Sequence, residues 1–199
     1  MPFYVFDVET TGLMDFKRAA DAEGQPRVAS FAGLAVDHPD DEPEVFERYV
    51  RPDGWAMSPD ASRVNGLTNE FLAQRGVPIA EVLDEYARRI EAGYTMVAFN
   101  AQFDLKMMRA EMRRAGRDDL FERTKNVCVM RPLTSILRIP GRYGFKWPNL
   151  AEACAHFGIV NAKAHDAVGD AWAALEVMRH LHRDGLLPEP AVHYAKQRP

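Results

Sequence analysis

The sequence has very little cysteine and no long apolar run. Only two of its 199 residues are cysteines, Cys128 and Cys154, and they stand in unlike contexts. This excludes a disulfide framework, and the lack of CxxC and CxxH pairs argues against a structural zinc site. No run of about 18 apolar residues is present, so no membrane span is predicted. Residues 1–7 also lack the pattern of a signal peptide, and we therefore expect a cytoplasmic protein.

Internal repeats, low-complexity segments and a clear linker are also absent. With 47% apolar and 27% charged residues, the composition is that of a soluble globular chain, and the length fits one domain. We expect a domain over residues 1–184 and a tail over 185–199, which contains three of the prolines.

The hydrophobic pattern changes along the chain. Its first third has short apolar, β-rich stretches, and later segments have helical spacing. This order predicts an α/β (α+β) fold with a mixed sheet flanked by helices. The expected strands are 3–8, 27–37, 44–51, 94–99 and 127–130. The expected helices are 69–74, 79–92, 101–115, 147–157 and 166–183. A loop at residues 53–65 and the segment 138–148 are the expected excursions from the domain.

Charge is distributed unevenly although the formal net charge is only −4. Residues 106–146 contain eleven basic and four acidic residues, whereas residues 37–47 are strongly acidic. This asymmetry allows a basic surface for phosphates on an acidic protein. A set of solvated helix faces explains the same composition.

Two acids lie close together near the end of the first expected strand. Asp7 and Glu9 are two residues apart, so their side chains point to the same side of a strand. Like charges about 4 Å apart repel by roughly 4 kcal/mol at an effective dielectric constant near 20. A bridging cation or protonation of one acid relieves this repulsion. Alternatively, one of the acids faces water where the strand ends.

Two further groups of polar residues stand at expected helix starts. Asn100 and Asp104 follow the strand 94–99, where Asn100 is a candidate cap and Asp104 complements the helix dipole. His165 precedes a helix that carries Asp166 and Asp170 one turn apart. A histidine has the near-neutral pKa of a general base, although a capping Asp166 beside a surface histidine is an equally simple explanation.

Taken in order, these motifs resemble the DEDD exonucleases with histidine in the last motif. D-x-E-T-T-G-L begins at Asp7, N-A-x-F-D at Asn100 and H-x-A-x-x-D at His165. The family includes the proofreading subunit of bacterial DNA polymerase III and stand-alone exodeoxyribonucleases. The resemblance extends over residues 3–182 and implies an RNase H-like fold with a mixed five-stranded sheet.

The resemblance also implies a catalytic centre with two divalent cations, Mg²⁺ or Mn²⁺. The residues that match the metal-binding acids are Asp7, Glu9, Asp104 and Asp170. His165 matches the general base, and the five-residue offset from it selects Asp170 over Asp166. Hard carboxylate oxygens suit these ions. Two such ions clamp the attacking and leaving oxygens of a phosphoryl displacement.

Substrate contacts are implied around the first two motifs. Leu13 and Gly12 match positions against the terminal nucleotide, and Phe103 matches an aromatic near the last bases. For Leu13 and Phe103, ordinary core packing is the alternative. The other expected contacts are Thr10, Asn65 and Asn100. Asn65 replaces a histidine of some relatives, and Phe99 precedes Asn100 where histidine is frequent.

The expected activity is that of a 3′-to-5′ exonuclease that releases nucleoside 5′-monophosphates from single-stranded or frayed DNA ends. An exoribonuclease of the same family and a non-catalytic nucleic-acid-binding or polymerase accessory module are the alternatives. A homodimer and a polymerase are the protein partners that the resemblance implies. The tail after Gly185 is too short for an extra domain, which favours a free-standing enzyme.

Overall fold

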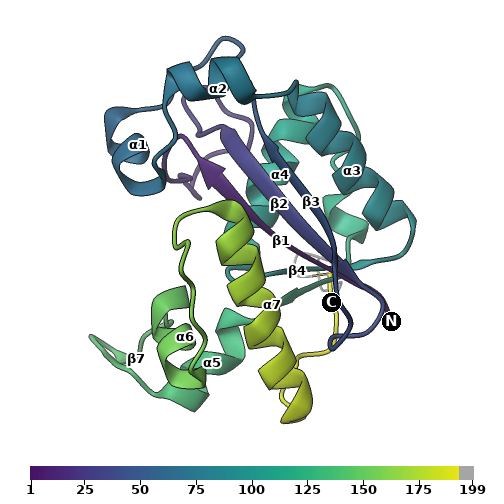
Figure 1. The fold of residues 1–199 in the computed structure, drawn as a ribbon, viewed down its shortest axis with the longest axis vertical. Helices are drawn as coiled ribbons and strands as arrows, with labels where there is room; N and C mark the ends of the chain where they lie inside the picture. The colour runs from purple at the N-terminus through teal and green to yellow at the C-terminus, as the bar shows by residue number, and fades with distance from the viewer. Residues whose placement is uncertain (193–199) are drawn as a thin grey trace.

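A computed structural model describes residues 1–192 and shows a five-stranded mixed sheet in the order β3-β2-β1-β4-β5 (Figure 1). β1 pairs antiparallel with β2, which pairs antiparallel with β3, whereas β4 lies parallel to β1 and β5 parallel to β4. The strands are β1 (Phe3–Thr10), β2 (Val28–Val36), β3 (Glu44–Tyr49), β4 (Thr95–Ala98) and β5 (Asn126–Cys128). The predicted mixed five-stranded sheet is confirmed.

The middle of the sheet is buried because its strands carry almost continuous apolar side chains. All nine residues of β2 are buried, as expected for a strand covered on both faces. Gly33 on β2 permits one close approach. A Cβ at that position would lie 2.0 Å from the hydroxyl oxygen of Tyr4. The Tyr4 hydroxyl donates a hydrogen bond of 3.2 Å to Oε1 of Glu85, which lies on helix α3 (Ile79–Glu91).

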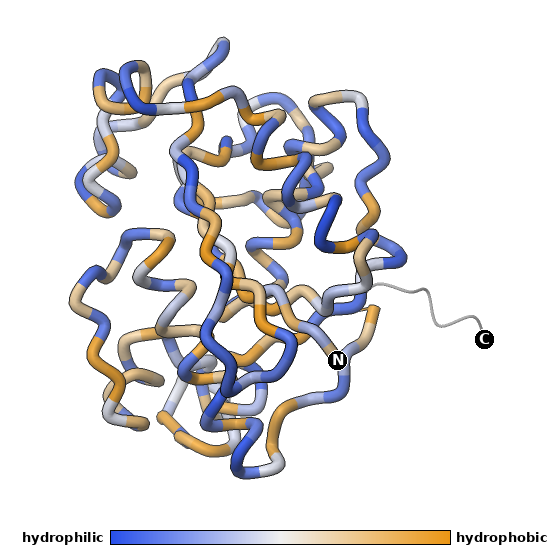
Figure 2. The backbone as a smooth tube through the Cα atoms, turned by 45° about the vertical axis from the view of Figure 1, so that its right-hand side comes forward, coloured by the Kyte–Doolittle hydropathy of each residue, from blue (hydrophilic) through white to orange (hydrophobic). Residues whose placement is uncertain are grey.

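Helices cover both faces of the sheet. In Figure 1, α7 (Ala167–Arg183) crosses in front of the strands, and α4 (Ala101–Arg114) lies behind them next to α3 (Ile79–Glu91). Each of these helices alternates between hydrophobic and hydrophilic stretches (Figure 2), as helices with one buried side do. The remaining predicted helices are α2 (Asn69–Arg75) and α6 (Leu150–Phe157).

The two segments expected to be excursions contain regular structure. α1 (Pro59–Asn65) occupies the end of the expected loop 53–65 and buries none of its residues, so it has no apolar periodicity to detect. The segment 138–148 contains a short hairpin, in which β6 (Pro140–Gly141) pairs with β7 (Gly144–Phe145). A 3₁₀ turn, η1 (Phe121–Arg123), was not predicted either.

The predicted strand 127–130 was partly wrong. β5 ends at Cys128, and α5 (Met130–Leu137) begins two residues later. The helix was not predicted from the sequence because Pro132 lies in it. Proline is tolerated there because the first turn of a helix leaves its N–H groups unbonded.

The residues after α7 return to the edge of the sheet. Leu187 packs against the main core, and Ala191 and Asn126 exchange two backbone hydrogen bonds of 3.0 and 3.1 Å. The first part of the expected tail 185–199 therefore contacts the domain, and residues 193–199 lie outside the described residues. Within residues 1–192, no helix is both long enough and apolar enough to span a membrane.

Candidate active site

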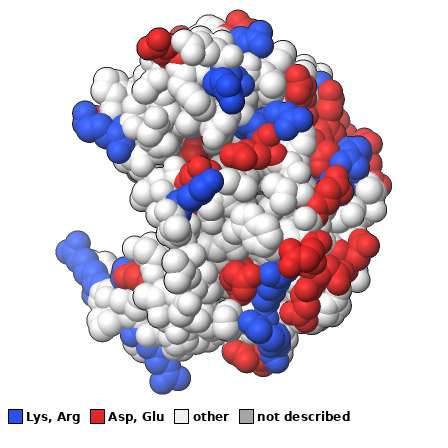
Figure 3. Space-filling model, viewed as in Figure 1, with Lys and Arg blue, Asp and Glu red and all other residues white. Residues whose placement is uncertain are grey.

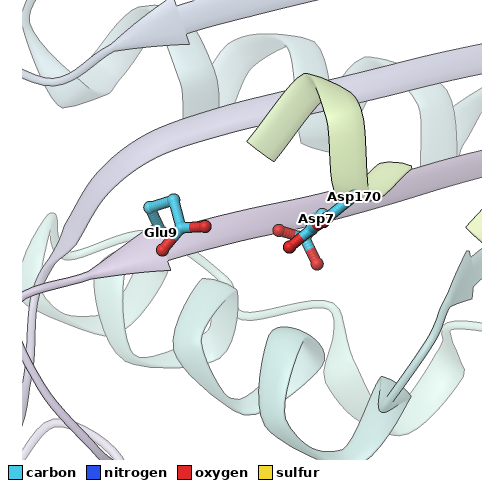
Figure 4. Close-up of side chains that lie close together, drawn as sticks. All are labelled: Asp7, Glu9 and Asp170. Atoms are coloured by element: carbon cyan, nitrogen blue, oxygen red, sulfur yellow. The ribbon is translucent and has the colours of Figure 1, made fainter. Parts of the chain in front are cut away.

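Three carboxylates from two distant segments meet at the carboxyl end of β1. Asp7 and Glu9 project from β1, and Asp170 projects from the first turn of α7 (Figure 4). One ligand oxygen of each lies within 4.8 Å of the others. The pairing between β1 and β2 shifts in register between Glu9 and Thr10, so the regular ladder is interrupted directly after Glu9.

Asp104 supplies the fourth acid from the first turn of α4. It is only 4% exposed, and among the charged neighbours of Asp7 it causes the largest electrostatic rise in the pKa of that acid. Its carboxylate accepts backbone hydrogen bonds from Val8 and from its own N–H group, which lower its pKa. The hydrogen bond from Val8 therefore connects this acid to β1, next to Asp7.

Burial and mutual repulsion make these acids hard to ionise. The pKa of Asp7 lies well above its ordinary value, first because of burial and then because of Asp104, Asp170 and Glu9. Burial, followed by repulsion from Asp170, raises the pKa of Glu9 to about 8. Burial likewise raises the pKa of Asp104 to about 7 and also raises that of Asp170.

This donor set fits divalent cations. Carboxylate oxygens are hard ligands of the kind that Mg²⁺ and Mn²⁺ prefer, and three of them already lie within 4.8 Å of one another. A bound cation also removes the repulsion that raises the pKa values, because an opposite charge nearby favours the ionised carboxylate. These carboxylates therefore fit the divalent cations that the family resemblance implied.

His165 lies at the edge of this cluster on the segment before α7. Its backbone N–H group is 3.3 Å from Oδ2 of Asp170, and its side chain lines a cavity of about 490 Å³ together with that acid. The residue is exposed and has a positive φ of 65°, a left-handed conformation that is uncommon outside glycine. The backbone of His165, which carries the imidazole, is therefore in the left-handed region.

Sequence reasoning missed Asn161, which orients one of the acids. Its Nδ2 donates a 2.6 Å hydrogen bond to Oδ1 of Asp170 and lowers the pKa of that carboxyl. Asn161 is nine residues before Asp170 in a segment without helical or strand periodicity, so no spacing in the sequence connects the two. Only the folded loop brings them together.

A second cavity of about 610 Å³ adjoins Glu9 and contains most of the expected substrate contacts. Leu13, 91% exposed, stands at this cavity opposite α1. Hydrogen bonds from Asn65 to the Thr10 carbonyl and from Ser58 to the Thr11 carbonyl connect the two sides. The expected contacts that line the cavity are Thr10, Gly12, Leu13, Asn65 and Phe103.

The side-chain cap expected of Asn100 is not formed, whereas the cap expected of Asp166 is. Asn100 is not among the residues that line the two cavities, and it occupies the N-cap position of α4 without a side-chain cap hydrogen bond. Asp166 does cap α7, because its carboxylate accepts a hydrogen bond from the N–H group of Val168 at 3.1 Å. Asp166 and Asp170 thus have different tasks on adjacent turns.

Ion pairs neutralise about half of the basic residues in the segment 106–146. Six of the eleven basic residues in 106–146 form ion pairs with carboxylates, so their charges are not free for phosphates. These residues are Arg109, Arg113, Arg114, Arg117, Arg123 and Lys146.

Comparison with known proteins identifies the family. The family model described as Exonuclease (RNase_T) matches residues 4–178, which include all four acids and His165. The chain belongs to this exonuclease family. The resemblance to the DEDD exonucleases is therefore confirmed, and the chain is an exonuclease domain.

Individual relatives agree with this assignment. The DNA polymerase III subunit epsilon of Treponema pallidum is 27% identical over 195 residues, which cover 98% of this chain and 79% of that protein. Exonuclease I of Methylocaldum szegediense has the same fold with a TM-score of 0.73 at 23% identity. That match covers 92% of this chain but 40% of the other.

A second similar structure is the nuclease domain of 3′hExo, a DEDDh family member bound to rAMP. Its TM-score is 0.73 at 13% identity, and the match covers 96% of both chains. A match of this extent confirms the RNase H-like fold.

Proposed function

We propose that this chain is a metal-dependent 3′-to-5′ exonuclease that releases nucleoside 5′-monophosphates from DNA ends. The observation that supports this most directly is the convergence of Asp7, Glu9 and Asp170, whose ligand oxygens lie within 4.8 Å of one another. A structural role does not account for such crowding, because burial of like charges without a cation is unfavourable.

In this proposal Asp7, Glu9, Asp104 and Asp170 hold two divalent cations, Mg²⁺ or Mn²⁺. The bound cations supply charge stabilisation at the reacting phosphate and activate water. Asn161 and the His165 N–H group hold the Asp170 carboxylate in place through hydrogen bonds of 2.6 and 3.3 Å. The imidazole of His165 accepts a proton from the attacking water.

The cavity beside Glu9 receives the terminal nucleotide. The exposed side chain of Leu13 and the partly buried ring of Phe103 line it, and both offer apolar surface to a base without reading its identity. In this proposal the 3′-hydroxyl of the terminal nucleotide contacts the backbone around Thr10, next to Glu9. This arrangement favours removal of one nucleotide at a time from an end.

Digestion of a 5′-labelled oligonucleotide tests the proposal. We expect a ladder of shortened products in Mg²⁺ or Mn²⁺, none in EDTA, and a loss of at least about 10³-fold in kcat for Asp7→Asn, because several kcal/mol of transition-state stabilisation depend on the cations. Asp53→Asn, which neutralises an exposed acid outside the cluster, is the control. Absence of a ladder for the wild-type protein in either metal contradicts the proposal.

RNA is the second candidate substrate, because the similar 3′hExo structure contains rAMP. Discrimination depends on contacts to the 2′-hydroxyl. We favour DNA because the Treponema relative is a subunit of a DNA polymerase. DNA and RNA oligonucleotides of matched sequence distinguish the two, and a higher kcat/KM on RNA assigns the activity to an exoribonuclease.

A further inference from the structure

The hairpin between α5 and α6 carries an unusual concentration of exposed aromatic side chains. Tyr143, Phe145 and Trp147 are 89%, 55% and 58% exposed and occur at every second residue. All residues from 140 to 147 are exposed, and Pro148 is the first buried one. Large apolar side chains clustered in this way mark interaction sites on soluble proteins.

The same hairpin is rich in basic residues. No acid occurs between Glu122 and Glu152 in the sequence. Within the described part of the chain, Arg138 and Arg142 form no ion pair with a carboxylate, whereas Lys146 pairs with Glu152 at 2.6 Å. The guanidinium carbon of Arg142 lies 5.1 Å from the centre of the Tyr143 ring. The hairpin therefore presents a cation and an aromatic ring together.

This hairpin leads directly to the active site. Asn149, two residues after Trp147, lines the 490 Å³ cavity together with His165 and Asp170. In Figure 1 the hairpin projects below α1, and the space-filling view shows a hollow between the upper and lower parts of the molecule, with basic side chains projecting at the edge of the lower part (Figure 3). A strand that ends at the carboxylates can thus continue along the hairpin.

We propose that the hairpin 138–147 binds the single-stranded part of the substrate that lies upstream of the terminal nucleotide. Aromatic rings stack on bases of any sequence, and arginine adds both stacking and attraction to phosphates. The carboxylate cluster and the overall charge of −4 repel a nucleic-acid backbone, so an adjacent basic element supplies local attraction. This inference rests on the proposed exonuclease activity and adds its substrate class, single strands longer than the nucleotide being removed.

The test compares a long and a short substrate. The double variant Tyr143→Ala/Trp147→Ala should weaken binding of a fluorescent 20-nucleotide single strand, measured by anisotropy in Ca²⁺, by about ten-fold or more. It should leave kcat/KM on the p-nitrophenyl ester of thymidine 5′-monophosphate within about two-fold of wild type, because that ester has no upstream bases. The variant Tyr143→Phe/Trp147→Phe keeps both rings and should bind like wild type.

Charge is tested separately with Arg142→Ala. Its Kd should rise more at low than at high salt, whereas Arg183→Ala, which removes an exposed arginine at the far end of α7, should have little effect. Unchanged oligonucleotide binding in Tyr143→Ala/Trp147→Ala overturns the inference. A parallel loss on the ester also overturns it. If the wild-type protein binds the strand through these rings but cleaves neither substrate, the proposed activity fails and the inference about binding stands.

Discussion

At the scale of single residues, the acids around Asp7 govern how stability responds to pH. The pKa of Glu9 is about 8 in the folded protein, against an ordinary value of 4.5. Below pH 4.5 the carboxyl is protonated in both the folded and the unfolded chain. As pH rises toward 8, only the unfolded chain ionises freely, so folding loses stability.

In EDTA, the free energy of unfolding should therefore fall as pH increases from about 5 to 8, and Glu9→Gln should make this dependence shallower. Urea denaturation at a series of pH values measures it. Glu91→Gln, at an exposed position at the end of α3, is the control and should keep the wild-type slope. An identical slope in Glu9→Gln contradicts the electrostatic account of the site.

A different acid acts as a structural clamp. Glu111 is 1% exposed and accepts hydrogen bonds from Arg27 at 2.8 and 3.0 Å and from the Val28 N–H group at 3.2 Å. We expect Glu111→Ala to lower the free energy of unfolding by about 3–5 kcal/mol, because it leaves a charge and a backbone donor without a partner.

The matched control for this clamp is Asp118→Ala. Asp118 pairs with Arg123, and both side chains are about two-thirds exposed, so its loss should cost less than about 1 kcal/mol. Urea denaturation compares the two variants. Equal losses would mean that burial does not set the strength of these pairs.

At the scale of elements, the fit between α7 and the segment before it positions His165. A Cβ at Gly169 would lie 2.4 Å from the carbonyl oxygen of Lys163, so the helix requires glycine where this segment crosses it. Gly169→Ala should displace residues 161–165 and lower kcat by about 10²-fold, since small misplacements of catalytic groups have effects of that size. Oligonucleotide digestion gives kcat, and a melting temperature close to wild type separates local displacement from unfolding. Unchanged kcat means that the segment adapts without moving the imidazole.

Elements with a regular apolar pattern were predictable from the sequence, and the others were not. Helix α3 buries residues such as Val82, Leu83 and Tyr86 at helical spacing, so local sequence and tertiary environment agree. Helix α1 buries nothing, and the strands of the hairpin are two residues long each. Such elements depend on capping and turn geometry, which leave a weak periodic signal.

The candidate site was predictable only in part. The spacing of Asp7 and Glu9 on one strand already implied a shared face, but nothing local connected them to Asp170 or Asp104. Their convergence followed from the family resemblance and depends on which helix packs on which side of β1. The hydrogen bond from Asn161 had no sequence signal at all, because a loop conformation creates it.

At the scale of the whole molecule, cation binding should be linked to folding. A ligand present at 100 times its Kd stabilises the folded state by about 2.7 kcal/mol, and each kcal/mol shifts the melting temperature by about 2–4 °C for a domain of this size. Mn²⁺ should therefore raise the melting temperature of the wild-type protein and of Asp53→Asn but not that of Asp7→Asn. Differential scanning calorimetry measures this, and a similar rise in Asp7→Asn would place the cation elsewhere.

The backbone bridge between Asn126 and Ala191 also bears on how this protein behaves at high concentration. Strand β5 ends the sheet, and an uncovered border strand offers unsatisfied amides to any neighbouring chain. The opposite border, β3, carries Glu44, Glu47 and Arg48, whose charges deter such lateral association. On the β5 side the two hydrogen bonds with Ala191 occupy part of the border, so shortening the chain before Ala191 would free this one edge to pair with the β5 edge of a second copy.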